Sequence, residues 1–415
     1  MERVCIAGGL RSYIGVENGI YRNLSAEQLG AFVLREVLYK YQVPEEDIGF
    51  VIAGNGVGAG GNLTRLMMLE AGLREEIPAM TVDVQCGSGL EAVAAAAAKI
   101  ECGLIDTAIA GGFESCSTKP VRVRNPHHPD YAGNESYDIR ELSKLGNAYR
   151  TAKFVPGKPD ELAMFRGAED VAALWEMDKH RLNRYVITSH ERAAKAAEDR
   201  ELQEMIAAPC FAYEEKGTEA LRSRKMCGKD EGIRPHISER FLDRLPMLIP
   251  GGKYITAGNS CLTHDGAAFV LLCSKEYLAA HGLSKKAEIV DVVSAGGSPW
   301  RSPESILPAI DQLLARNHLT AEEITAWEYN EAFAVIDYLM EEKYGKDCGR
   351  YNIFGGALAY GHPYGASGGI IILHLLEAMR KLEPPDTAKR HGQGKYGIAA
   401  IAAAGGIGTA ILLKE

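Results

Sequence analysis

The sequence TVDVQCGSGLEAVAAAAAKIECGLIDTAIAGG, residues 81–112, carries the clearest structural pattern in the chain. A β-branched run at residues 81–84 predicts a buried strand, and the alanine-rich segment 89–103 predicts a helix. Residues 107–110 predict the next strand. A strand, a crossover helix and a second strand in this order indicate an α/β fold with a parallel sheet.

The same alternation extends to both sides of this unit. Residues 48–53 predict a strand, and residues 63–71 predict a helix. Near the end of the chain we expect a strand, a helix and two paired strands, at residues 351–354, about 367–380, 396–403 and 409–413.

The two ends of the chain look like relatives. Each contains a Gly-Ser-Gly-like turn that opens an apolar helix, at residues 87–89 and 365–368. Each also leads to an Ala-Gly-Gly strand end, at residues 110–112 and 404–406. These parallels predict an internal duplication, although two glycine-rich turns can also arise independently.

The composition sets the broad class of protein. A length of 415 residues predicts two to three domains or one large duplicated fold. The contents of 46% hydrophobic and 24% charged residues exclude disordered, coiled-coil and collagen-like chains. The net charge is −9 and the basic residues are scattered, so we expect neither a nucleic-acid nor a membrane partner.

The cysteines and the apolar segments bear on metal sites and on location. The nine cysteines are widely spaced and form no Cys-x-x-Cys pair, so neither a disulfide framework nor a metal site is expected. The longest apolar stretch, residues 398–413, is interrupted by glycines and is shorter than the roughly 20 residues of a membrane span. We therefore expect a cytoplasmic protein.

Cys86 is the first candidate catalytic residue. It lies between a predicted strand and a predicted helix, where helix N-terminal amides or a nearby imidazole can lower a thiol pKa from about 8.5 by one or more units. Glycines on both sides of Ser88 leave room for a ligand near the sulfur. A small buried apolar cysteine is the alternative interpretation.

His362 and Asn330 are the other candidates. His362 is held between a glycine and a proline, and a restrained imidazole suits a base that must deprotonate a thiol. A turn histidine bonded to the backbone is the alternative. Asn330 follows the apolar run 324–329, where it could donate to a carbonyl or act as an ordinary helix N-cap. The role of His264, beside Asp265, stays open.

A dinucleotide-binding loop is the hypothesis from a different class. Residues 56–61 read GVGAGG, which matches Gly-x-Gly-x-x-Gly after a predicted strand and before a predicted helix. Asp83 lies about 20 residues further on, as that motif requires. However, Asp83 would share a strand with Cys86, and the pattern alone is unspecific. An NAD-dependent oxidoreductase therefore remains as an alternative.

Several motifs together resemble the thiolase family, almost from end to end. They are residues 84–89, 111–115, 257–259 with 265–266, the Asn-Glu-Ala-Phe motif at 330–333, and the Gly-His-Pro motif at 361–363. The resemblance implies two βαβαβαββ halves in a five-layer α/β/α/β/α core with an inserted loop domain. The expected boundaries are 1–118 and 254–284 for the N-terminal half, 119–253 for the inserted loop domain, and 285–415 for the C-terminal half.

The resemblance also implies an activity. Thiolases transfer acyl groups between coenzyme A thioesters, work as homodimers or homotetramers, and need no cofactor besides the substrate. Cys86 would carry the acyl group, and His362 would activate it. Asn330 and His362 would form one oxyanion hole, and the backbone amides of Cys86 and Ala404 the other, each donor being worth about 10²- to 10³-fold in rate.

Substrate contacts and one departure follow from the same resemblance. Met164 and Phe333 would line the pantetheine tunnel, and Cys261 occupies a position where a serine that contacts coenzyme A is common. Thiolases usually carry a second cysteine that exchanges the α-proton of the acyl acceptor, and the alignment places Ala402 there. We therefore expect acylation of Cys86 with weak or absent thiolysis if Ala402 is natural. A thiolase-fold enzyme limited to acyl transfer, or a silent thioester-binding subunit, stays open.

Overall fold

The computed structural model describes residues 4–129, 131, 147–149, 152–157, 160–207, 210–213, 223–226, 228–346, 349–390 and 394–415. The strands are β1 Val4–Arg11, β2 Gly15–Val16, β3 Phe50–Gly54, β4 Ala79–Val82, β5 Thr107–Ser115, β6 Arg122–Val123, β7 Ala148–Tyr149, β8 Cys210–Tyr213, β9 Ser223–Met226, β10 His264–Ser274, β11 Ala287–Gly296, β12 Ala326–Tyr329, β13 Tyr396–Ala403 and β14 Ile407–Lys414.

The α-helices are α1 Ala26–Tyr41, α2 Leu63–Glu70, α3 Ser88–Glu101, α5 Ala163–Leu174, α6 Lys179–Ala196, α7 Arg200–Glu204, α8 Glu239–Leu242, α9 Lys275–Ala280, α10 Ile306–Arg316, α11 Ala334–Tyr344, α12 Ala357–Tyr360, α13 Tyr364–Lys381 and α14 Asp386–Arg390. Short 3-10 helices cover Glu45–Asp47, Pro299–Ser305 and Ala321–Glu323. The predicted elements 48–53, 63–71, 81–84, 89–103 and 107–110 are therefore confirmed as β3, α2, β4, α3 and β5, with ends shifted by a few residues.

Two sheets of matching topology form the core, as the duplication predicts. In the N-terminal half, β3 pairs in parallel with β4 and β5, β5 pairs antiparallel with β10, and β10 pairs antiparallel with β1. In the C-terminal half, β12 pairs in parallel with β13, β13 pairs antiparallel with β14, and β14 pairs antiparallel with β11. A short antiparallel contact between β1 and β11, at Cys5 and Ile6, joins the two sheets at the middle of the molecule.

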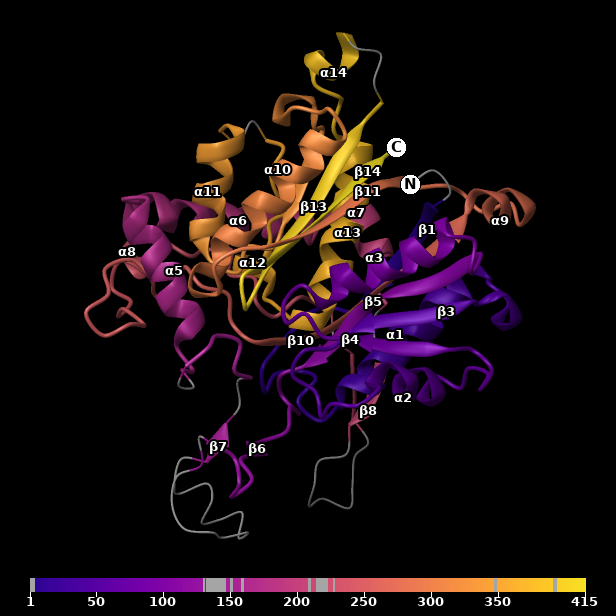
Figure 1. The fold of residues 1–415 in the computed structure, drawn as a ribbon, viewed down its shortest axis with the longest axis horizontal. Helices are drawn as coiled ribbons and strands as arrows, with labels where there is room; N and C mark the ends of the chain where they lie inside the picture. Colours follow the sequence, from indigo (N-terminus) through magenta and orange to yellow (C-terminus); the bar gives the residue numbers. More distant parts are fainter. Residues whose placement is uncertain are drawn as a thin grey trace.

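Helices cover both sheets and fill the space between them (Figure 1). Helices α3 and α13 contact strands of both halves, so they form the shared middle layer. On the outer faces, α1 and α2 pack on the N-terminal sheet, and α10 packs on β11 and β14. The result is the expected α/β/α/β/α order of layers.

Glycines allow the two middle helices to cross closely. A Cβ atom on Gly89 of α3 would lie 2.4 Å from the carbonyl oxygen of Gly365, and one on Gly368 would lie 2.0 Å from the backbone nitrogen of Leu90. Real Cβ atoms do not approach backbone atoms so closely, so only glycine fits at these positions. This crossing holds the start of α3 against the start of α13, and with them the segments that carry Cys86 and His362.

The region between β5 and β10 contains the elements β6 to β9 and α5 to α8. Helices α5 and α6 are amphipathic, and their apolar faces join Leu242 and Ile255 in the apolar cluster of the C-terminal half, where α5 contacts the 3-10 helix 299–305 and α6 contacts α11 and α12. Figure 1 shows α5 and α8 at one side of the molecule, apart from α1 and α2. The predicted boundaries of this inserted region at residues 119 and 253 stay predictions.

One predicted strand is wrong. Residues 351–354 make only an isolated bridge from Tyr351 to Trp327 of β12. Asn352 has a left-handed backbone with φ 39°, which breaks the extended run. Its side-chain amide bonds both the N–H and the C=O of Tyr329, at 2.8 and 3.0 Å, and so takes the place that a neighbouring strand would fill.

Candidate active site

The turn before α3 is strained and internally bonded. Gln85, directly before Cys86, has φ 51°, which non-glycine residues seldom adopt. The Ser88 hydroxyl donates to the Gln85 carbonyl at 2.6 Å and accepts from the Val84 N–H at 2.8 Å. These bonds fix Cys86 at the entrance of the helix.

The Cys86 sulfur is buried and faces backbone donors. The residue is 8% exposed, and the backbone N–H groups of Cys86 and Ala404 lie close enough to its sulfur to lower the thiol pKa. Burial nevertheless raises the Cys86 pKa to about 12, and the charge of Glu114 adds to this rise, while the two amides oppose it. The sequence-based expectation of a lowered thiol pKa is therefore wrong for the ligand-free site, because desolvation outweighs the helix N-terminus.

The His362 imidazole has a defined orientation. Its Nδ1 lies 2.6 Å from the Ser367 hydroxyl, which also lies 3.3 Å from the Pro363 carbonyl. A carbonyl can only accept, so the hydroxyl donates to Pro363 and Nδ1 carries the imidazole proton. Nε2 then accepts from Asn330 Nδ2 at 3.3 Å. Burial lowers the His362 pKa to about 3, and the positive charge that His264 could carry adds to this effect.

Tyr364 packs on the candidate base. Its ring meets that of His362 edge-on at 4.9 Å. Burial raises the Tyr364 pKa well above its ordinary value, and the negative charges that Cys116, Cys261 and Cys86 could carry contribute to the rise. The phenol therefore helps to hold the imidazole at the start of α13.

His264, left open by the sequence, belongs to the support of His362. It is 2% exposed, and its Nδ1 lies 2.7 Å from the Leu262 carbonyl and 3.3 Å from the backbone N–H of His362. Its ring lies where a Cβ on Gly361 would otherwise be, at 2.2 Å, and Gly361 has φ 102°. The Gly-His-Pro motif needs glycine at that position for both reasons.

Asn330 is not a helix N-cap. Helix α11 begins at Ala334 with Phe333 as its N-cap, so the alternative interpretation of Asn330 is wrong. The Asn330 N–H donates to the Ala400 carbonyl at 3.1 Å, which ties the loop to β13. The next residue, Glu331, accepts from the Ser189 hydroxyl at 2.6 Å.

The segment around Cys261 lies between the Asn330 loop and His362. The Cys261 N–H donates to the Ala332 carbonyl at 2.8 Å. Isolated β-bridges join Ser260 to Phe333 and Thr263 to His362. Burial raises the Cys261 pKa, and the charge that Cys86 could carry raises it further, so the two thiols interact.

The predicted substrate-contacting residues share one apolar cluster. Phe333 and Ala402 are buried in it, and Met164 and Cys261 pack against it. The ring of Phe165, next to Met164, meets Phe333 edge-on at 5.9 Å. The structure thus brings these four predicted positions together.

Glu114 and Ser367 are the residues whose roles the sequence did not reveal. Glu114 is fully buried and accepts from the N–H groups of Gly56 at 2.8 Å and Gly365 at 3.1 Å. It thereby links the first half to the start of α13. Burial raises its pKa to about 7, although the amides oppose the rise. Both residues could have been selected from the sequence, because Glu114 follows the Ala-Gly-Gly strand end and Ser367 lies in the second glycine-rich turn.

Glu114 also bears on the dinucleotide alternative. The N–H groups of Gly56 and Val57 donate to its carboxylate, and that of Gly58 donates to Asn55 Oδ1 at 2.9 Å. These amides would have to bind a pyrophosphate in a dinucleotide site. Since they already have internal acceptors, the loop does not offer them to a cofactor.

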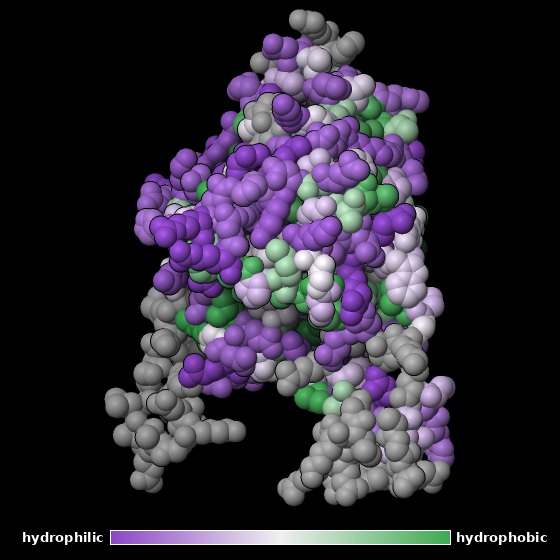
Figure 2. Space-filling model, turned by 90° about the vertical axis from the view of Figure 1, so that its left-hand side faces the viewer, coloured by the Kyte–Doolittle hydropathy of each residue, from purple (hydrophilic) through white to green (hydrophobic). Residues whose placement is uncertain are grey.

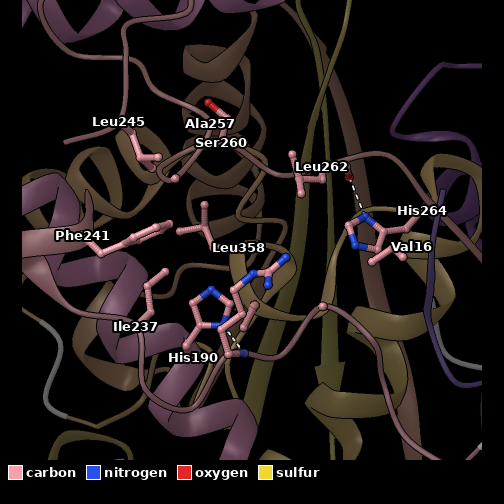
Figure 3. A pocket seen from close by; sticks show the side chains of 14 residues that line it. Val16, His190, Ile237, Phe241, Leu245, Ala257, Ser260, Leu262, His264 and Leu358 are labelled. Atoms are coloured by element: carbon pink, nitrogen blue, oxygen red, sulfur yellow. Dashed lines mark hydrogen bonds between the residues drawn. The ribbon is translucent and has the colours of Figure 1, made fainter. Parts of the chain in front are cut away.

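A cavity of about 310 Å³ lies beside this constellation (Figure 3). Its lining residues are Val16, His190, Gly232, Arg234, Ile237, Phe241, Leu245, Ala257, Gly258, Ser260, Leu262, His264, Leu358 and Ala359. Apolar side chains of Phe241, Leu245 and Leu358 gather at one end, and His264 faces the cavity from the other. Neither Cys86 nor His362 lines it, so the segment 257–264 separates the cavity from the thiol.

The exterior matches a protein with a mainly polar surface. The face that carries α5 and α8 is predominantly hydrophilic, with scattered hydrophobic areas (Figure 2). Of the helices in the described ranges, none is both long enough and apolar enough to cross a bilayer. In the same ranges, the carboxylates of Asp199, Glu201 and Glu377 lie close together, but Lys381 pairs with all three.

Comparison with protein families shows which family the chain belongs to. Residues 4–276 match the family model "Thiolase, N-terminal domain", and residues 283–415 match "Thiolase, C-terminal domain". The chain belongs to the thiolase family. It is therefore an acyltransferase, in agreement with the resemblance seen in the motifs.

Thiolase relatives match over their whole length. The "Putative acetyl-CoA C-acetyltransferase VraB" of Staphylococcus aureus is 32% identical over 415 residues and is covered completely, as is this chain. A protein of the same name from Staphylococcus haemolyticus is 31% identical, with 100% of this chain and 99% of the relative covered.

Solved thiolase structures confirm the fold. The Bacillus anthracis acetyl-CoA acetyltransferase superposes with a TM-score of 0.84 at 26% identity, covering 100% of this chain and 99% of that one. Human mitochondrial 3-ketoacyl-CoA thiolase gives a TM-score of 0.83 at 25% identity with the same coverage. The predicted thiolase-like fold class is thus confirmed.

Proposed function

We propose that this thiolase is an acyl-CoA C-acyltransferase that forms or cleaves a carbon–carbon bond through an S-acyl-Cys86 intermediate. The main support is that two backbone amides, from Cys86 and from Ala404 of the other half, lie near enough to the Cys86 sulfur to lower the thiol pKa. Donors in that position would bind the oxygen of a thioester attacked by the sulfur.

Acylation begins with a proton transfer from Cys86. With a pKa of about 12, a free Cys86 thiolate would cost about 7 kcal/mol at pH 7, so the proton must leave as the new C–S bond forms. His362 Nε2 carries the available lone pair, and Ser367 holds the ring through Nδ1. The attacked C–S bond breaks, the departing coenzyme A sulfur takes a proton from a second acid of the site, and His362 keeps the proton from Cys86 on Nε2.

The second half-reaction takes place beside the Asn330 amide and His362 Nε2. Asn330 Nδ2 lies beside His362 Nε2, so both groups can bind one thioester oxygen when Nε2 carries a proton. That oxygen gains negative charge when an enolate forms, and two donors at this point lower its energy. Condensation and thiolysis are the two directions of this step.

Substrate binding follows from the surrounding surface. We assign Met164, Phe333 and Cys261 to the acyl and pantetheine end, because they form one apolar wall. The adjacent cavity carries an exposed Arg234 and a Phe241 that is 53% exposed. A cation and an aromatic ring suit the phosphates and the base of the nucleotide end.

A second candidate function is acyl transfer without enolate chemistry. Ala402 favours it, since a methyl group at the usual place of the second cysteine exchanges no proton. A homodimer or homotetramer and a cytoplasmic location stay predictions. The partly exposed edge strand β4, which pairs on one side with β3, offers backbone groups to a second copy.

Intact-mass measurement tests the proposal. The purified protein is incubated with acetyl-CoA, and we expect a mass increase of one acetyl group that is absent from the C86A variant. A C102S variant, which loses an exposed thiol, should still be acylated. Binding of coenzyme A without a mass increase in the wild type would contradict the proposal and favour a silent binding subunit.

A further inference from the structure

The enolate step needs a group that exchanges a proton with the α-carbon of the second thioester. Ala402 is 3% exposed in β13, opposite Gly408, and cannot supply one. The apolar cluster that contains Ala402 also contains Phe333, and Cys261 packs against it from a different segment.

The extended stretch 260–264 decides where the Cys261 side chain points, because it is held by bridges at Ser260 and Thr263. Ser260, Leu262 and His264 line the cavity beside the site, whereas Cys261 does not. In an extended segment successive side chains point to opposite faces. Cys261 therefore faces away from that cavity, and it packs against the cluster that contains Phe333 and Ala402.

Two further contacts place Cys261 beside the reacting groups. Its N–H is bonded to Ala332, next to Phe333, and the bridge from Thr263 to His362 holds the other end of the segment. The charge that Cys86 could carry raises the Cys261 pKa, which agrees with this placement. Cys261 thus lies between the two motifs that would bind the enolate oxygen.

We infer that Cys261 is the second catalytic thiol, and that it exchanges the α-proton from the wall opposite the usual one. This inference rests on the proposed function. Its role is distinct from a contact with pantetheine, because a serine could make that contact equally well. The chain would then have moved the acid–base thiol from the strand β13 to the segment that enters β10.

The proton balance can be written for thiolysis. Cys86 attacks the 3-keto carbon and passes its proton to His362, and the C2–C3 bond breaks to leave an enolate. Cys261 S–H donates its proton to the α-carbon, and acetyl-CoA leaves. Coenzyme A then attacks the S-acyl group and gives its thiol proton to Cys261, while the Cys86 sulfur recovers the proton held by His362. The reverse sequence performs condensation.

The protonated resting state of the Cys261 thiol suits thiolysis, in which this thiol must donate a proton. Burial and the neighbouring Cys86 both raise its pKa, so the thiol is protonated and ready to donate at neutral pH. Positioned proton transfer contributes about 10²- to 10⁴-fold to a rate. We expect the wild type to catalyse thiolysis in spite of Ala402.

Two variants separate acid–base chemistry from substrate contact. C261S keeps a hydroxyl of similar size but loses the thiol, and the double variant C261S/A402C returns a thiol to β13. Thiolysis of acetoacetyl-CoA and acetylation of Cys86 are measured on each, with C102S as the matched control. We expect C261S to lose at least 100-fold in kcat with KM within about threefold, while Cys86 is still acetylated. The double variant should regain at least tenfold.

The two assays distinguish failure of the inference about Cys261 from failure of the proposed function. If wild-type Cys86 is not acetylated, the proposed function fails. If it is acetylated but C261S retains thiolysis within about threefold, Cys261 is no proton carrier and the inference is overturned. Acetylation without any wild-type thiolysis also overturns it, and favours the enzyme limited to acyl transfer.

Discussion

The turns before α3 and α13 occupy equivalent places in the two halves, yet their serines have different partners. Ser88 bonds only the backbone of its own turn, through Gln85 and Val84. Ser367 bonds the imidazole of His362. The first turn is therefore built to hold a strained backbone under a nucleophile, and the second to hold a base by its ring.

This difference shows how a duplicated fold can divide one reaction. In the proposed mechanism, the N-terminal half presents the thiol and one of its amide donors. The C-terminal half would supply the base, the Asn330 amide and the Ala404 N–H. The glycine crossing of α3 and α13 brings the two contributions together, so neither half is complete alone.

The largest effect should come from removing the base. We expect H362N to lower the rate of Cys86 acetylation about 10²- to 10⁴-fold, because no other described side chain is held in its place for the proton. The rate is measured by rapid quench and intact mass. H374N, which replaces another buried imidazole on α13, is the matched control. An H362N rate within tenfold of the wild type would show that the halves do not divide the chemistry in this way.

The crossing itself can be broken by one methyl group. In G368A the new Cβ would meet the Leu90 backbone nitrogen at 2.0 Å, so the two helices must separate. We expect a loss of about 3 kcal/mol or more in the free energy of unfolding, measured by urea denaturation. G296A, where a Cβ meets nothing within 4 Å, should change stability by less than about 0.5 kcal/mol. Equal effects of the two variants would show that close approach is not required.

The link between the halves through Glu114 predicts a pH effect on stability. Its folded pKa of about 7 lies above the ordinary 4.5, so the folded state binds more protons between these values. Stability from this group is therefore lost as the pH rises from about 4.5 to 7, by about 3 kcal/mol in total. His362, with a lowered pKa, acts in the opposite sense and loses stability as the pH falls below 6.5.

Urea denaturation at pH 5 and pH 7 measures the Glu114 effect. E114Q removes the titrating proton, so its stability should decline less between the two pH values than that of the wild type. E322Q, at an exposed position, serves as the control. An unchanged pH slope in E114Q would mean that the carboxylate titrates near its ordinary pKa.

We expect the smallest effects from replacing Ser367 or Ser88, and the two substitutions should change different properties. S367A frees the His362 ring and should lower the acetylation rate about tenfold with little loss of stability. S88A removes two bonds to the turn and should lower the free energy of unfolding by about 1–2 kcal/mol. Reversed or equal effects in these two assays would remove the basis of the comparison.

Local patterns were sufficient for much of the fold and for the main site residues. The run 396–403 was predicted with the limits that β13 has, because a short, continuously apolar run beside glycine-rich turns is encoded locally. Cys86 and His362 could be selected because glycines and proline mark the turns that hold them. The long-range pairing of these turns depends on the crossing of α3 and α13, which the thiolase resemblance implied but no local pattern encodes.

Two features could not be predicted from the sequence. One is that the Asn352 side chain replaces a neighbouring strand, and the other is the effect of burial on the pKa of Cys86. Nothing in the composition of residues 351–354 shows that the Asn352 amide replaces a strand beside Tyr329. The pKa of Cys86 depends on how completely the surrounding chain excludes water, which a helix N-terminus in the sequence does not reveal. The role of Cys261 likewise depends on segments far apart in the chain.

The distribution of the site over both halves has a consequence for synthesis. A nascent chain carries Cys86 out of the ribosome long before His362 and the Ala404 amide have been made. During that interval the Cys86 thiol lacks both its base and its second amide donor, so its reaction with acyl-CoA is not catalysed. Under the proposed mechanism, chemical competence would appear only when β13 and β14 are in place, which would couple the onset of activity to synthesis of the C-terminal half.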